Sequence, residues 1–140
     1  MNKENIIYFA GIFDGEGSMM IELQSKNAVR KYDYFSLRVV VTNTNLELIQ
    51  WLKTNFGGNI GTRPQIQGRK ITYDWKIYSK DAANIIKSAL PYLIIKKQRA
   101  LVFIEFAETI GKTGWNITEE IRLQRQSLYN SMKIHNKQGT

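Results

Sequence analysis

Two carboxylic acids lie close together near the start of the chain, in the segment Phe9–Gly17. Asp14 and Glu16 follow an apolar run that predicts a short helix over 5–14, ended by the glycines that come after it. Acidic side chains at the C-terminal end of a helix face the negative end of the helix dipole. A divalent cation held by hard oxygen ligands would offset that charge, so the pair indicates a metal site. An ordinary acidic turn is the simpler alternative.

The same segment also carries small residues at helical spacing. Gly11 and Gly15 are four residues apart, with Ala10 beside them, so the two glycines share one face of the predicted helix. Small residues on a helix face let the backbone of another helix approach closely. The segment therefore suggests a helix-to-helix contact next to the acids, although an ordinary core helix would explain the glycines alone.

Apolar periodicity predicts a mixed architecture for the rest of the chain. Alternating apolar and polar residues predict strands over 18–24, 34–42, 59–65 and 70–78. Helical spacing predicts helices over 46–56, 95–110 and 118–134, and another helix that Ser79 caps and Pro91 ends. The order α-β-β-α-β-β-α, followed by C-terminal helices, predicts a single α+β domain with a mostly antiparallel sheet and all helices on one of its faces.

The sheet face turned away from the helices is predicted to be polar and basic. Its expected residues are Glu22, Gln24, Ser36, Arg38, Thr42, Arg63, Lys70, Thr72, Asp74 and Lys76. The chain has 20 Lys and Arg against 12 Asp and Glu, a net charge of +8. This surplus favours a polyanionic partner, because neutralised phosphates release their counterions. A solvated sheet face is the usual alternative, and many basic proteins bind no nucleic acid.

Other compositional features exclude some classes of protein. The chain has no cysteine, which rules out disulfides and thiolate metal sites. No apolar run approaches the roughly 20 residues of a membrane span, so we expect no membrane partner. The apolar stretch 6–13 is followed by acids instead of a small-residue cleavage site, so we expect an intracellular, non-secreted protein. Host and compartment, organellar or prokaryotic, stay open.

The segment Phe9-Ala10-Gly11-Ile12-Phe13-Asp14-Gly15-Glu16-Gly17, followed by this order of strands and helices, resembles the signature of the LAGLIDADG homing endonucleases over nearly the whole chain. One copy is present, so the resemblance implies the single-motif branch, whose members act as homodimers. It implies one endonuclease domain over 1–140 with a saddle-shaped sheet. The expected divisions are a motif and dimer helix at 1–17, the sheet and helices at 18–110 and a C-terminal helix at 111–140.

The resemblance also implies roles for individual residues. Two motif helices would pack side by side at the dimer axis through Phe9, Ala10, Gly11, Phe13 and Asp14. Glu16 and the backbone carbonyl of Gly15 would bind Mg²⁺, for which other divalent cations are expected to substitute. The metal would support hydrolysis of both DNA strands with a staggered cut.

Two further residues correspond to the polar pocket around the reacting phosphate in this family. Lys96, within the segment 91–99, would stabilise developing negative charge there, and Asn43 would line the same pocket. The acidic Glu47 departs from the pattern, because it lies near a position where a relative has a pocket arginine.

The resemblance implies that the sheet lies in the major groove of double-stranded DNA, where Arg and Lys pair with guanine and Gln with adenine. The two-fold axis of a dimer would require a long, nearly palindromic target. The expected DNA-binding residues are Glu22, Gln24, Lys26, Arg30, Lys31, Ser36, Arg38, Arg63, Lys70, Thr72, Asp74 and Lys76. An RNA-binding intron-splicing maturase and a non-cleaving DNA-binding regulator are the alternatives. The presence of Glu16 favours the nuclease.

Overall fold

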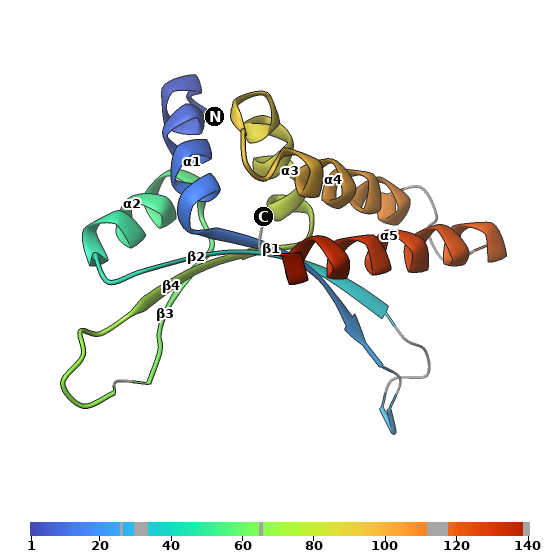
Figure 1. Cartoon of the computed structure of the whole chain (residues 1–140), viewed down its shortest axis with the longest axis horizontal. Helices are drawn as coiled ribbons and strands as arrows, with labels where there is room; N and C mark the ends of the chain where they lie inside the picture. Colours follow the sequence, from blue (N-terminus) through green and yellow to red (C-terminus); the bar gives the residue numbers. More distant parts are fainter. Residues whose placement is uncertain (26, 30–33, 65, 112–117, 139–140) are drawn as a thin grey trace.

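The computed structural model describes residues 1–25, 27–29, 34–64, 66–111 and 118–138, which form a four-stranded sheet covered by helices (Figure 1). The strands are β1 (Gly17–Gln24), β2 (Tyr34–Asn43), β3 (Asn59–Thr62) and β4 (Tyr73–Tyr78). The helices are α1 (Lys3–Glu16), α2 (Leu46–Phe56), α3 (Ser79–Ala89), α4 (Lys97–Gly111) and α5 (Glu119–Gln138), with a 3₁₀ turn, η1 (Leu90–Tyr92), after α3. None of the helices in this part of the chain is both long and apolar enough to cross a membrane.

The sheet is antiparallel throughout, with the strand order β1-β2-β4-β3. Strand alternation buries one face, which carries Met19, Leu37, Val39, Trp75 and Ile77. The helices lie on this buried side, and the two hairpins bend away from them so that the sheet forms an arch (Figure 1). The predicted α+β class and the predicted one-sided covering are confirmed.

An aromatic cluster fixes α1 to the helix-covered side of the sheet. The ring of Phe9 lies 5.4 Å from those of Phe13 and Phe56 and 6.0 Å from that of Trp75. The indole N–H of Trp75 donates to the carbonyl of Gly57 at 2.7 Å. Because aromatic side chains bury large apolar areas, this cluster holds the helix rigidly relative to β4.

Several element boundaries differ from the sequence prediction. The first helix begins earlier, because the side chain of Asn2 caps it by accepting from the N–H of Asn5, and it ends later, at Glu16. Gly15 is therefore inside the helix. Ser79 does not cap α3: it is the first helical residue, with φ 55°, and the cap residue Tyr78 makes no side-chain bond.

The second hairpin also has shorter strands than predicted. Strand β3 ends at Thr62 and β4 begins at Tyr73, whereas we expected strands to reach residue 65 and to start at residue 70. Pro64 has no N–H to extend the ladder. The last pairing beyond the strands is the bond from the N–H of Arg63 to the carbonyl of Thr72, at 2.9 Å. Lys70 consequently lies in the connecting turn.

Candidate active site and nucleic-acid interface

The C-terminal tip of α1 runs directly into β1. The N–H of Gly17 donates to the carbonyl of Phe13 and ends the helix. A Cβ atom at position 17 would lie 2.0 Å from Cδ1 of Phe13, so only glycine lets the strand leave the helix across this ring. The exposed Glu16 is the last helical residue and therefore sits where the helix meets the sheet.

Asn43 holds the carboxylate of Glu16. It ends β2, close to the start of β1, and its Nδ2 donates to Glu16 Oε2 at 2.5 Å. Its Oδ1 accepts from the N–H of Asn45 at 2.7 Å, which fixes the orientation of the amide. The structure therefore brings together two of the residues expected at the site. Because the amide is neutral, it orients Glu16 without balancing its charge.

Asp14 has a different set of partners. Its carboxylate accepts from the backbone N–H of Ile94 at 2.7 Å and from that of Lys96 at 3.0 Å. In return, Nζ of Lys96 donates to the backbone carbonyl of Asp14 at 2.7 Å. The segment between η1 and α4 is thereby tied to the end of α1. Lys96 thus provides part of the positive charge that we expected a divalent cation to supply at this helix end.

Lys96 and Arg99 place two buried positive charges beside the helix tip. Lys96 is only 7% exposed; burial lowers its pKa, the nearby Arg99 lowers it further and Asp14 opposes the shift. Burial also lowers the pKa of Arg99. Arg99 donates to Asn136 at 3.2 Å, while its Nε and Nη2 have no hydrogen-bond partner among the described residues. Both charges are costly to bury and favour anionic groups nearby.

The oxygen donors at the tip fit a shared cation but not a site built by one chain. In the described part of the chain, no group of three His, Cys, Asp or Glu residues could hold a metal. One chain offers the exposed carboxylate of Glu16 and the carbonyl of Gly15, which has no helical N–H to accept from because Met19 lies in β1. Since Mg²⁺ requires about six oxygen ligands, the remaining ligands would have to come from elsewhere.

The side of α1 expected to face a second chain requires correction. Phe9, Ala10 and Phe13 are each 0% exposed and belong to the core of their own chain, so they offer no surface to a partner. Hydrophobic residues four apart mark the core-facing side of a helix, and this signal identifies Phe9 and Phe13. Asp14 is half-buried and bound within its own chain.

The opposite side of α1 carries the two glycines of the motif. Gly11 and Gly15 are exposed, and a Cβ atom at either position would meet nothing within 4 Å. Large apolar side chains are exposed nearby: Ile7 and Tyr8 (57%) on the same helix, and Ile94 (86%), whose N–H binds the helix end. This glycine and apolar side is the accessible face of α1.

The outer face of the sheet holds two arginine–carboxylate pairs. Arg63 Nε lies 3.0 Å from Oδ1 of Asp74, and Arg38 Nη2 lies 2.7 Å from Oε1 of Glu22. Asp74 is buried, unlike the exposed base-contacting residue that we predicted. Thr42, directly opposite Asp74 on β2, donates to its Oδ1 at 2.6 Å.

The other expected DNA-binding residues are distributed along the two hairpins. Ser36 lies opposite Glu22, and Lys76 lies opposite Val40, both half-buried. Gln24 ends β1, and Thr72 precedes β4. The expected loop residues Lys26, Arg30 and Lys31 lie outside the described residues.

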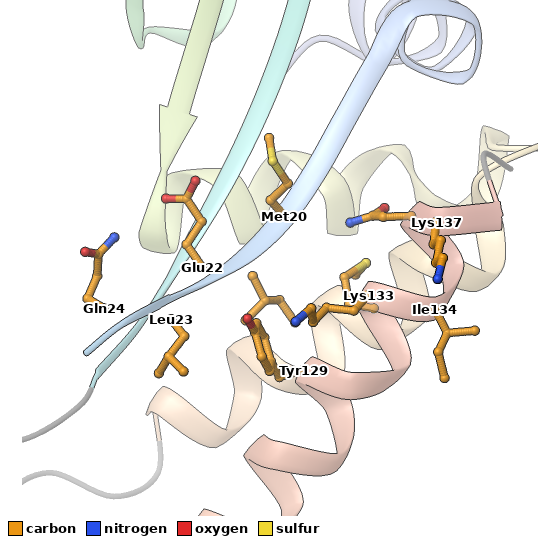
Figure 2. Close-up of a pocket in the computed structure, with 11 residues that line it drawn as sticks. Met20, Glu22, Leu23, Gln24, Tyr129, Lys133, Ile134 and Lys137 are labelled. Atoms are coloured by element: carbon orange, nitrogen blue, oxygen red, sulfur yellow. The ribbon is translucent and has the colours of Figure 1, made fainter. Parts of the chain in front are cut away.

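A groove of about 680 Å³ extends this face at the edge of β1, where the C-terminal half of α5 runs beside the strand. Figure 2 shows Glu22 and Gln24 on the strand side and Tyr129, Lys133 and Lys137 on the helix side. Nζ of Lys133 lies 5.2 Å from the centre of the Tyr129 ring, a cation–π contact. We did not include these helix residues among the predicted site residues, although their spacing of four places them on one helix face.

The arched sheet, the one-sided helices and the acidic tip of α1 define the fold of the LAGLIDADG homing endonucleases. The family model described as LAGLIDADG endonuclease matches residues 9–110, well over half of the chain. The chain therefore belongs to the LAGLIDADG endonuclease family, as the resemblance of its motif indicated. No protein among the curated ones matches it.

Solved structures with the same fold include complexes with DNA. The homing endonuclease I-CvuI in complex with its target is 13% identical with a TM-score of 0.75, over 94% of this chain and 82% of that one. The archaeal intron-encoded homing endonuclease I-Vdi141I, complexed with DNA, is 18% identical with a TM-score of 0.76, over 93% and 82%. I-SmaMI, bound to uncleaved DNA with calcium ions, is 26% identical with a TM-score of 0.67, over 94% of this chain but 45% of that one.

Proposed function

We propose that this protein is a site-specific homing endonuclease that acts as a homodimer and, with Mg²⁺, makes a staggered double-strand break in a long, nearly palindromic DNA target. The observation that carries this proposal is the position of Glu16. Its carboxylate is exposed, oriented by a neutral amide and placed at the end of a helix whose accessible side carries Gly11 and Gly15.

The geometry of the tip supports a metal shared between two chains and the DNA. Glu16 and the Gly15 carbonyl of each chain, together with phosphate oxygens, would complete the coordination of a hard divalent cation. When bound, Mg²⁺ would polarise the scissile phosphate and make water a stronger nucleophile. Asn43 is a positioning residue for Glu16. Lys96, anchored on the Asp14 carbonyl, would stabilise negative charge near the phosphate.

The glycines of α1 support the dimer. Glycine inside a helix costs roughly 0.5–1 kcal/mol relative to alanine. Neither Gly11 nor Gly15 is needed for packing within the chain, because a Cβ atom at either position would meet nothing within 4 Å. A second copy of α1 that approaches closely would explain both residues. It would also cover the exposed apolar side chains of Tyr8 and Ile94.

Cleavage of DNA tests the proposal directly. Genomic DNA from the organism that carries the gene would be incubated with the full chain and Mg²⁺, and the new ends sequenced. We expect breaks at one or a few sites that share a nearly palindromic sequence, with a constant overhang. EDTA and the Glu16→Gln variant should both abolish the breaks. Random ends, or no Mg²⁺-dependent ends, would refute the proposal.

Gly11→Leu tests the dimer separately. The open space at this position and the better helix propensity of leucine predict a folded chain that is slightly more stable, by about 0.5–1 kcal/mol. The side chain would keep two α1 helices apart, so sedimentation should show a monomer where the parent chain is a dimer. Asn55→Leu, at the end of α2, is a control that should remain dimeric. A dimeric Gly11→Leu variant would show that α1 is not the contact.

A further inference from the structure

Arg63 belongs to a closed ring of hydrogen bonds on the outer face of the sheet. Its Nε donates to both carboxylate oxygens of Asp74, at 3.0 and 3.2 Å, and its Nη2 donates to Oγ1 of Thr42 at 3.3 Å. The hydroxyl of Thr42 in turn donates to Asp74 at 2.6 Å. Every donor meets an acceptor around the ring, so the plane of the guanidinium is fixed before any ligand arrives.

The ring leaves the outer end of this guanidinium available. Of its five N–H groups, the ring uses the one on Nε and one on Nη2. Both N–H groups of Nη1 and the second on Nη2 have no partner among the described residues, and the side chain is 57% exposed. Two parallel donors from the Nη atoms match the O6 and N7 acceptors of guanine in the major groove.

The carboxylate of Asp74 is not available to DNA in the same way. Asp74 is 7% exposed, and three hydrogen bonds already engage its oxygens. A carboxylate open to the groove would also repel the phosphates. Bound to Arg63, it restrains a flexible side chain, which removes conformational entropy that binding would otherwise have to overcome.

Arg38, the other arginine of these two pairs, is less accessible from outside the sheet than Arg63. Its side chain is 24% exposed, and its Nη2 is engaged by Glu22 at 2.7 Å and by the sulfur of Met20 at 3.2 Å. Its Nε is buried without a partner among the described residues. Arg38 lies against the sheet, whereas Arg63 extends from the end of β3.

We infer that Arg63 is the guanine-reading residue of this surface and that Asp74 and Thr42 position it. The inference deepens the proposed function and rests on it. Since two copies of the chain would bind the target with two-fold symmetry, the target carries a guanine at mirror positions in its two halves, one for each Arg63.

Selection of binding sites from a DNA pool tests the role of Arg63 in base recognition without requiring cleavage. The full chain would be given a pool of randomised DNA duplexes with calcium in place of magnesium, and the bound sequences counted. We expect the parent chain to enrich a symmetric sequence. At one position in each half, guanine should be preferred over the other bases by about tenfold or more. Arg63→Ala should reduce that preference to near twofold and leave the other positions unchanged. Asp74→Asn should weaken it at the same positions.

Two controls keep the outcomes separate. Arg69→Gln removes one charge from the same hairpin and should weaken binding to all sequences equally, with no change in base preference. Circular dichroism of each variant would verify that it folds. If Arg63→Ala weakens all sequences equally, Arg63 binds a phosphate and the inference is wrong. If the parent chain enriches a site with no Arg63-dependent guanine, the inference alone fails. If it enriches no sequence, the proposed function fails as well.

Discussion

The carboxylates at the tip of α1 and those on the outer face of the sheet are paired in opposite ways. On the sheet, Asp74 and Glu22 each lie against an arginine, at 3.0 and 2.7 Å. At the tip, Glu16 is held by the neutral amide of Asn43. A carboxylate balanced by a guanidinium has little charge left to attract a cation, whereas Glu16 keeps its charge. The acids of the sheet are therefore neutralised by their arginines, and Glu16 is the acid proposed to bind a metal.

Asp14 is a third case, although it is only two residues from Glu16. It accepts two backbone N–H groups of the segment before α4, and Lys96 binds its carbonyl. Neighbouring acids of one motif therefore have different tasks: Asp14 holds the fold together and Glu16 faces outward.

The largest expected effect is the loss of cleavage in Glu16→Gln. Glutamine keeps the shape and the bond to Asn43 but removes the charge of the proposed metal ligand. Since a metal contributes several kcal/mol to such reactions, the cleavage rate should fall by about 10³-fold or more. Initial rates on a cloned target would measure this. The free energy of unfolding should not fall, because an acid is removed from a helix C-terminus. A cleavage rate within tenfold of that of the parent chain would show that Glu16 is not the metal ligand.

Asp14→Asn should affect stability instead. The amide would offer one acceptor to two N–H groups and would remove the negative charge that Asp14 places beside Lys96. Loss of a charge-assisted bond and an unsatisfied N–H together predict a decrease of about 2–3 kcal/mol in the free energy of unfolding. Urea denaturation would measure it, with Glu16→Gln as the matched control. A loss below about 1 kcal/mol would contradict the structural role of Asp14.

Asn43→Ala should change the metal requirement. Removal of a side chain that orients a metal ligand costs about tenfold in metal affinity. The Mg²⁺ concentration at half-maximal cleavage should therefore rise by about that factor, while the rate at saturating Mg²⁺ falls less. Asn55→Ala, at the far end of α2, should leave the Mg²⁺ dependence unchanged. An unchanged midpoint in Asn43→Ala would show that Glu16 needs no positioning by Asn43.

Lys96 gives the smallest effect, a dependence of stability on pH. Burial lowers its pKa in the folded chain below the usual 10.5, so between these two values the unfolded state binds more protons. Stability from this group therefore rises as pH increases through that window. Urea midpoints at a series of alkaline pH values should show the rise in the parent and in Lys97→Met, the exposed neighbour. The rise should be absent in Lys96→Met, and its persistence there would contradict the burial effect.

The sequence predicted the order of elements and the two faces of the sheet, because strand alternation and helical spacing are local patterns. Strand β2 and helix α2 were predicted to within one residue. It did not predict partners far apart in the chain, such as Asp14 with the N–H of Ile94, which lie 80 residues apart. The side of α1 was assigned wrongly for Phe9, Ala10 and Phe13, because the motif was taken as a whole, whereas the spacing of its two phenylalanines marks the core-facing side.

The direct passage from helix to strand at Gly17 fixes the distance between Glu16 and the side chains of β1. No loop separates Glu16 from the strand, so the distance from the acid to Glu22 is set by an extended backbone of roughly 20 Å, at about 3.3 Å per residue. Along a duplex that rises about 3.4 Å per base pair, this is near six steps. In the proposed nuclease, exchanging side chains on the strand would therefore change which bases are bound, while the distance between the bound bases and the cleaved bonds stays constant.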